Sequence, residues 1–348
     1  MRLQAGTIYF ARETNLDQPG YSNLVKIGLV EDPRTDWDRL SEHQTGNPRK
    51  LELLEGQSVH TQAVKYVESQ MHKAFASKRI QGEWFRFDSE AEIEVAVDKA
   101  KSLAAEVEDR VPVFSAALKL EKVFHKGEVK QANQELRDLV KQILTNQVIL
   151  GKYNSMISKI KSSMKRAAAE HEEGAALYAE TITVYHKPKF SVGQFRKMFG
   201  KTHADLIATC TNKESVPFED FSLLSDGVEV SIPDDLQERL DDLESKVNRL
   251  TSAKDYYELN NLLLQIREES SVFEWEVEFN LAKIKVACGE APGIEGVCSW
   301  IRELRLSKAK FDAGKLAHLE PELYKQAIVQ TEPSPRTIYR WYKTDKTP

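Results

Sequence analysis

The sequence predicts a small α+β unit at the N-terminus, followed by a mostly α-helical region that contains one long coiled-coil helix. Two observations favour this fold class. Short apolar segments alternate with helical patterns within residues 1–108, and apolar residues recur in steps of three and four, without proline, through residues 128–169. The 348 residues suggest two or three domains at roughly 150 residues each, and the 41% apolar content suffices for folded cores.

The N-terminal pattern begins with a predicted β-hairpin. Its strands are joined through Asp17-Gln18-Pro19-Gly20, where proline presets φ and glycine accepts a positive φ. Alternating or short apolar runs predict strands over residues 7–10, 24–29, 51–54 and 83–87. Periodic apolar runs predict helices over residues 36–44, 62–77 and 90–105.

Residues 128–169 are expected to form the long coiled-coil helix. A polar residue, Asn146, occupies one core position and would set the register at some cost in stability. A second, shorter seam runs from Leu236 to Leu250. The two seams could pair within one chain, or the long helix could pair between two chains, and we expect a homo-oligomer formed through residues 128–169. The heptad core positions are Val129, Ala132, Leu136, Leu139, Ile143, Asn146, Leu150, Tyr153, Ile157, Ile160, Met164 and Ala167.

Four regions follow from these patterns: an α+β domain at 1–108, a long-helix region at 109–180, a basic and irregular then acidic segment at 181–232, and a helical C-terminal domain at 233–348. No internal repeat is apparent at this level.

Composition excludes several functional classes. Three cysteines are too few for a disulfide framework and fit a reducing cytoplasm. No apolar run approaches the ~18–20 residues that span a bilayer, so no membrane association is expected. Neither a dinucleotide-binding nor a P-loop glycine pattern occurs, so no nucleotide cofactor is expected. The net charge of −5 says little about partners.

Helical spacing gathers four polar residues into two pairs. Arg39 and His43 stand at i and i+4, and so do Glu68 and His72, so each pair shares one helix face. By itself each pair fits a solvated or structural helix face. The zinc-protease order His-Glu-x-x-His is absent.

The predicted hairpin adds three more candidates. Tyr9 lies in the first strand and Lys26 in the second, and Gly28 ends that strand, where the backbone could approach a phosphate closely. Hydrolysis of a phosphodiester needs such a set. A carboxylate can hold a hard cation, an arginine can stabilise charge on phosphate oxygens, and a tyrosine, histidine or lysine can take a proton from water.

In this order, the residues resemble the GIY-YIG nuclease superfamily, in the phage and mobile-element branch whose second signature reads Lys-Ile-Gly. The resemblance covers residues 1–105, about a third of the chain. It rests on Thr7-Ile8-Tyr9, Lys26-Ile27-Gly28, Arg39-Leu40 through Thr45-Gly46-Asn47-Pro48, Glu68-Ser69-Gln70-Met71-His72 and Gly82-Glu83-Trp84-Phe85.

The resemblance implies a small antiparallel sheet flanked by helices and a hydrolysis that uses one Mg²⁺ or Mn²⁺ per active site and leaves a 5′-phosphate. It implies that Glu68 binds the metal, that Arg39 binds the scissile phosphate and that Tyr9 positions or deprotonates the attacking water. His43 is a second candidate for the base, and Lys26 is a third that needs a lowered pKa.

Two departures and three supporting residues complete the comparison. Thr7 replaces the first glycine of the family pattern, and Lys26 stands where its second tyrosine is usual. Gly28, His72 and Glu83 are secondary candidates for the site.

Two basic tracts predict contact with nucleic acid. In the second tract aromatic residues interleave with the basic ones, a pattern typical of phosphate contacts beside base stacking. A solvated helix face with core aromatics explains each tract about as well. The basic residues are Lys152, Lys159, Lys161, Lys165 and Arg166 in the first tract, and Lys187, Lys189, Arg196, Lys197 and Lys201 in the second.

These patterns together predict a metal-dependent endonuclease that hydrolyses DNA, with RNA left open as a substrate. The resemblance suggests a setting in phage biology or anti-phage defence. The alternative is a non-catalytic nucleic-acid-binding or scaffold protein with a degenerate version of the fold and an oligomerisation helix.

Overall fold

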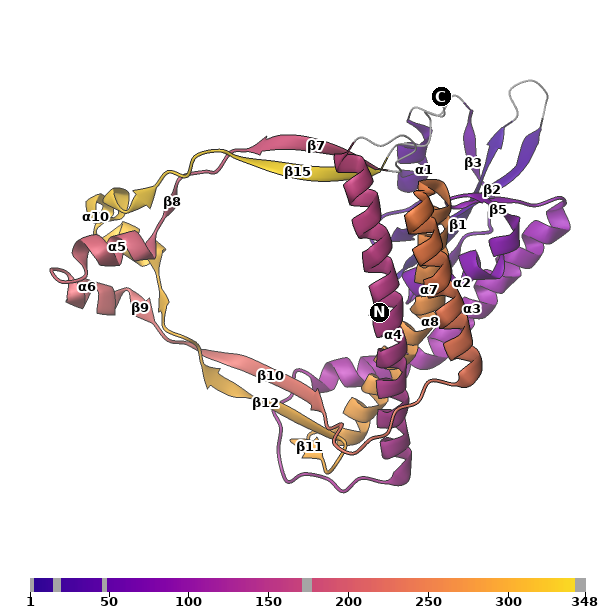
Figure 1. The fold of residues 1–348 in the computed structure, drawn as a ribbon. Coiled ribbons are helices and arrows are strands. Elements are labelled where there is room, and N and C mark those ends of the chain that lie inside the picture. The colour runs from indigo at the N-terminus through magenta and orange to yellow at the C-terminus, as the bar shows by residue number, and fades with distance from the viewer. Residues whose placement is uncertain (1–2, 15–19, 46–48, 171–176, 342–348) are drawn as a thin grey trace. The chain divides into compact units, whose positions relative to one another are not determined.

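The computed structural model describes residues 3–14, 20–45, 49–170 and 177–341 (Figure 1). Its contacts divide the chain into two compact units, Met1–Ser163 with Ser222–Trp300, and Met164–Phe221 with Ile301–Pro348. The division into four regions that the sequence suggests, with boundaries near residues 108, 180 and 232, stays a prediction. Among the described residues, no helix is long and apolar enough to cross a membrane.

The first unit contains an antiparallel sheet, as predicted for the N-terminus. Its strand order is β3-β1-β2-β6-β5, with β4 also pairing with β1. The short strands β4 and β5 were not predicted from the sequence. The predicted turn residues Asp17-Gln18-Pro19 lie outside the described residues. The strands are β1 (Gly6–Thr14), β2 (Tyr21–Glu31), β3 (Leu51–Leu53), β4 (Val59–Thr61), β5 (Arg79–Gln81) and β6 (Trp84–Arg86).

Three α-helices and one short 3₁₀ helix, η1 (Ala76–Lys78), accompany this sheet. The helix α1 (Asp36–Gln44) begins where Thr35 and Asp38 form a reciprocal capping box. The helix α2 (Val64–Ala74) carries Glu68. The helix α3 (Glu90–Leu120) starts where predicted but extends well past residue 105, with Pro112 inside it.

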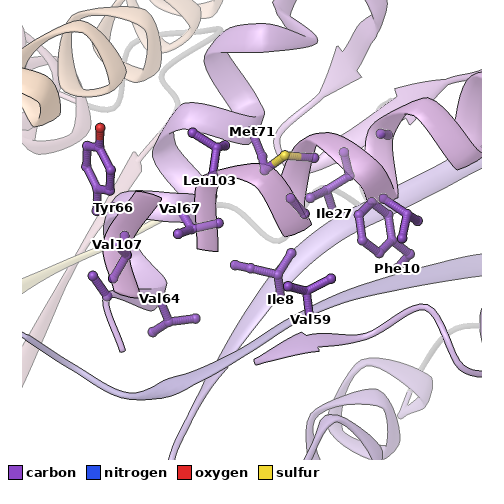
Figure 2. Close-up of a cluster of buried hydrophobic side chains, with 14 of the residues drawn as sticks. Ile8, Phe10, Ile27, Val59, Val64, Tyr66, Val67, Met71, Leu103 and Val107 are labelled. Atoms are coloured by element: carbon purple, nitrogen blue, oxygen red, sulfur yellow. The ribbon is translucent and has the colours of Figure 1, made fainter. Parts of the chain in front are cut away.

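The two faces of β1 have different surroundings. Ile8 and Phe10 point into the main core, which helices α2 and α3 complete (Figure 2). Tyr9 and Ala11 point to the opposite face, where they pack with Leu40 of α1. This alternation follows from the two-residue period of a strand. The labelled core residues are Ile8, Phe10, Ile27, Val59, Val64, Tyr66, Val67, Met71, Leu103 and Val107.

Helix α8 (Tyr256–Cys288) packs on the N-terminal domain although it lies far away in sequence. Its Trp275 stacks on Tyr66 of α2 at 4.7 Å between ring centroids. Its Glu268 accepts two hydrogen bonds from Arg79, at 3.2 and 2.6 Å. Helix α8 therefore supports the helix that carries Glu68.

The long helix α4 (Gln134–Ala169) begins later than the predicted residue 128. Its Lys152 donates a hydrogen bond to Gln237 of α7 (Asp234–Ala253) at 2.7 Å, and its Tyr153 donates one to Glu269 of α8 at 3.3 Å. The predicted seam of α7 is buried from Leu240 to Leu250. Helix α4 thus contacts α7 and α8 within one chain, while a coiled coil and a homo-oligomer formed through it stay predictions.

Strands and short helices occupy much of the C-terminal region that the sequence predicts as helical. β-Branched and aromatic residues such as Thr337-Ile338-Tyr339 favour this extended structure. The strands of this part of the chain, apart from four short ones in the second unit, are β7 (Leu177–Val184), β10 (Ser215–Leu223), β11 (Gly293–Ile294), β12 (Cys298–Leu306) and β15 (Ser334–Trp341).

The second unit also contains an internal repeat, which corrects the expectation that there is none. Two copies of a strand, two helices and a strand pair with each other. The first copy is β8 (Lys189–Phe190), α5 (Val192–Phe199), α6 (Ala204–Thr209) and β9 (Thr211–Asn212), and the second is β13 (Lys310–Phe311), α9 (Ala313–Leu319), α10 (Pro321–Gln326) and β14 (Ile328–Val329).

Candidate functional site

The hairpin places Tyr9 directly opposite Gly28 on the sheet face that packs against α1. A Cβ atom at position 28 would lie 2.6 Å from the Tyr9 hydroxyl oxygen, far inside van der Waals contact. Glycine is therefore required here to make room for the phenol ring of this chain. The predicted close approach at Gly28 is made by a side chain.

Arg39 of α1 reaches the same place. Its guanidinium donates a hydrogen bond to the Tyr9 hydroxyl, and another to Glu42 at 2.8 Å between Nη1 and Oε2. Burial raises the pKa of Tyr9 far above its ordinary value, and the nearby Glu83 raises it further. At neutral pH Tyr9 is a phenol that orients Arg39.

Lys26 and Glu83 form an ion pair beside them. Lys26 is buried, and its ammonium lies 6.0 Å from the centre of the Trp84 ring, to which its strand is paired. Burial acts to raise the pKa of Glu83, but the charge and hydrogen bond of Lys26 outweigh it and leave that pKa below its usual value. The two residues thus neutralise each other next to Arg39.

His43 lies one turn after Arg39 on α1 and is half-buried. Its Nε2 is shielded from solvent and has no hydrogen-bond partner among the described residues. Burial lowers the pKa of His43, and the positive charges of Lys26 and Arg39 lower it further. The ring is therefore neutral at pH 7 and offers an unshared nitrogen.

Glu68 of α2 carries the most informative perturbation of the group. Burial, and then the negative charge of Glu83, raise the pKa of its carboxyl to about 8, against a partial opposing effect of Lys26 and Arg39. A cation beside this carboxyl would favour its charged form and so lower its pKa. Glu68 is thus a suitable ligand for a positively charged group.

His72, one turn after Glu68, links α2 to the sheet. Its Nε2 donates to the Ile27 carbonyl at 2.8 Å, so its Nδ1 carries no proton, and its ring packs on Phe85. Burial lowers the pKa of His72 to about 4. This geometry holds the helix of Glu68 against the strand of Lys26 and Gly28.

The sequence analysis missed three residues that shape this site. Glu42 pairs with Arg39, and its i+3 spacing was a usable signal. Trp84 faces Lys26, as strand pairing could have suggested. Glu268 lies 3.9 Å from His72 Nδ1 and is one of the charges that raise the pKa of Glu68, yet no local pattern connects it to α2.

The first basic tract is partly used inside the protein. Lys152 and Lys159 of α4 donate hydrogen bonds to Gln237 and Asn248 of α7, and their contact with nucleic acid stays a prediction. Lys161 and Arg166 are exposed, and so is Lys165, whose ammonium lies 5.6 Å from the ring of Tyr339.

The second basic tract differs in its aromatic residues. Lys187, Lys189, Arg196, Lys197 and Lys201 are all exposed. The phenylalanines between them do not stack outward, because Phe190, Phe195 and Phe199 form the core of the repeat. The expectation of base stacking by these rings was wrong, since a small domain must bury its few large apolar side chains.

The donor set for a metal is small. Within the described ranges no group of three or more His, Cys, Asp or Glu side chains is placed to hold a metal ion. A single carboxylate is enough for Mg²⁺, which keeps several waters and shares substrate phosphate oxygens. Glu68, with its raised pKa, fits that minimal arrangement.

The fold and site define a small α+β domain in which the arginine of α1 acts on the pKa of the histidine of α1 and the glutamate of α2. Residues 6–103 match the T5orf172 domain, a phage-associated family related to nucleases. No curated protein matches the chain, and no solved structure does.

Proposed function

We propose that the protein is a metal-dependent endonuclease that hydrolyses phosphodiester bonds, with DNA as its first expected substrate. The observation that supports the proposal is that Arg39 hydrogen-bonds the Tyr9 hydroxyl and acts on the pKa of both His43 and Glu68 within the matched domain. The phage association of the domain suggests a role in phage biology or in defence against phage.

Glu68 would hold one Mg²⁺ or Mn²⁺, which polarises the scissile phosphate and offsets its developing charge. Burial makes the free carboxylate costly, so a cation gains more here than at an exposed glutamate. Glu68 then remains deprotonated below its metal-free pKa.

Arg39 would bind the non-bridging oxygens of the phosphate. Its guanidinium donates one hydrogen bond to Glu42 through Nη1 and another to the Tyr9 hydroxyl, and these two contacts orient it. A positive group held in advance stabilises the charge that builds in the transition state without reorganising. Tyr9 is thus a positioning residue.

His43 would act as the general base. Its neutral ring and unpartnered Nε2 can take a proton from water as the water oxygen bonds to phosphorus. The bond from phosphorus to the 3′ oxygen breaks, the leaving oxygen takes a proton from solvent, and the product carries a 5′-phosphate. Lys26, paired with Glu83, serves as a counter-charge.

The test is a substrate panel. Purified full-length protein is incubated with supercoiled plasmid, linear duplex, single-stranded DNA and RNA, with Mg²⁺, Mn²⁺ or EDTA. We expect nicking that needs a divalent metal and leaves 5′-phosphate ends. Binding without cleavage across the whole panel would favour the non-catalytic alternative.

A further inference from the structure

The second unit holds two copies of one sequence pattern. Lys-x-Lys-Phe-x-x-Gly occurs at residues 187–193 and again at 308–314. After each pattern the chain forms two short helices and a closing strand. The first strand of each copy pairs antiparallel with the last strand of the other, β8 with β14 and β13 with β9. The copies are therefore related by an approximate two-fold axis.

Backbone contacts repeat the relation in detail. The Ser191 amide donates to the Ala327 carbonyl at 3.0 Å, and the Asp312 amide donates to the Cys210 carbonyl at 2.7 Å. Ser191 and Asp312 also cap α5 and α9 through their side chains. These contacts exchange partners between the copies, so the symmetry belongs to one folded body.

The core of this body is built from equivalent apolar side chains of the two copies. Phe190 and Phe311 stack across the axis with 5.8 Å between their centroids and 9° between their planes. Around them lie two equivalent pairs of fully buried residues, Phe195 with Leu316 and Cys210 with Ala327.

Four lysines stand at equivalent positions of the two copies, Lys187 and Lys189 in the first and Lys308 and Lys310 in the second. Successive side chains of a strand point to opposite sides, so Lys189 and Lys310, next to the stacked phenylalanines, point outward. Lys187 and Lys308 precede them by two residues, and all four are exposed. None of the four forms an ion pair with another residue that the structure describes. We call this surface the lysine face.

Two acidic side chains of the second copy are engaged within it, while its Glu320 is exposed. Within residues 187–213 the acid is Asp205. In the second copy, Asp312 caps α9 and Glu322 pairs with Lys325 at 2.7 Å. A groove beside Lys308 and Lys310 also includes Glu214, so the second pair has the weaker positive field.

We propose that the lysine face binds a nucleic-acid duplex across one of its local two-fold axes, with each lysine pair on the phosphates of one strand. A double helix presents such axes, and symmetric proteins match them. Lysine contacts to phosphate are independent of sequence. This inference extends the proposed endonuclease by a duplex-holding surface, but duplex binding does not require cleavage.

The test measures duplex binding by fluorescence anisotropy in EDTA, where no cleavage occurs, over a range of salt concentrations. The full-length variants are Lys187→Gln/Lys189→Gln, Lys308→Gln/Lys310→Gln and the four combined. The matched control is Lys119→Gln/Lys122→Gln, which removes the same charge from exposed lysines near the end of α3. Each pair variant should reduce the slope of log affinity against log salt by about two, and the combined variant by about four.

Three results would overturn the inference: wild-type duplex affinity in the combined variant, dependence on one pair alone, or single strands bound as tightly with the same lysine dependence. Melting curves establish that each variant is folded. The outcomes separate from those of the nuclease proposal. Metal-dependent cleavage with an inert lysine face refutes this inference alone, and lysine-dependent duplex binding without cleavage refutes the nuclease alone.

Discussion

The N-terminal site and the lysine face use charged groups in opposite ways. In the site, Arg39 lies close enough to lower the pKa of His43 on its own helix and to act on the pKa of Glu68 on α2. On the lysine face, Lys189 and Lys310 point into solvent from a symmetric body. The first arrangement changes the chemistry of each group, and the second leaves each lysine a simple positive charge.

This difference teaches where each kind of function can reside. Chemistry needs groups whose protonation is altered by burial and neighbours. Phosphate binding needs accessible charge at a suitable spacing. Substitutions in the site should therefore change cleavage and leave duplex affinity intact, whereas substitutions on the lysine face should do the reverse.

The largest effect after loss of the metal ligand is expected at His43. Replacing it with glutamine removes the proposed base, and general-base contributions amount to about 10²–10⁴-fold in rate. Single-turnover cleavage with saturating metal measures this, with His60→Gln, an exposed histidine of the same domain, as the control. A rate within a few-fold of wild type would exclude His43 as the base.

The raised pKa of Glu68 predicts how the metal concentration needed for cleavage changes with pH. Its pKa of about 8 means that metal must displace a proton at neutral pH. The metal concentration for half-maximal cleavage should fall about tenfold per pH unit from pH 6 to 8, and then level off. A flat dependence would contradict a buried, protonated Glu68.

The same shift predicts stability without metal. The folded protein holds the Glu68 proton up to about pH 8, whereas an ordinary glutamate has a pKa of 4.5, so the folding stability contributed by this group falls as pH rises between those values. In EDTA, Glu68→Gln should therefore raise the melting temperature at pH 8 more than at pH 5. Equal changes at both pH values would argue against the raised pKa.

Gly28→Ala should destabilise the N-terminal domain by about 1–3 kcal/mol, because its Cβ would overlap the Tyr9 hydroxyl. Displacing Tyr9 also frees Arg39, so cleavage should fall with stability. Gly151→Ala, where nothing lies within 4 Å of the added atom, should instead stabilise α4 by about 1 kcal/mol. Denaturant unfolding measures the change in the free energy of unfolding for both variants. A change of the same sign in both would be inconsistent with the Tyr9 contact.

The smallest effect sharpens the symmetry of the second unit. Ser191→Ala and Asp312→Ala each remove a helix cap at equivalent positions and should each cost about 1 kcal/mol. Thermal melts of the two variants test this. A clear loss of thermal stability in one variant and none in the other would mean that the two caps do not stabilise their helices equally.

The sequence predicts the N-terminal fold well because local signals agree there. The hairpin and α1 lie where alternation and helical spacing place them. The sequence predicts Tyr9, Arg39, His43 and Glu68 as candidates, and the structure places Arg39 close enough to act on the pKa of the other three. Their roles as ligand, base or positioning group remain predictions, because roles depend on protonation and thus on surroundings.

Other features could not be read from the sequence for physical reasons. Glu268 acts on the site from a helix some two hundred residues away, and only tertiary packing brings it there. The repeat has few matching residues, and two long helices separate its copies. The hydrogen bonds of Lys152 and Lys159 to α7 could not be predicted, because no pattern near these lysines in the sequence indicates their partners.

The most direct test compares Glu68→Gln with Glu94→Gln, an exposed glutamate of α3, in single-turnover cleavage of a duplex with Mn²⁺. Both variants remove one carboxylate, and their melting curves establish folding. The account predicts a loss of about 100-fold or more for Glu68→Gln, unchanged duplex affinity in EDTA, and wild-type cleavage by Glu94→Gln. Wild-type cleavage by Glu68→Gln would contradict the proposed metal ligand and the site built around it.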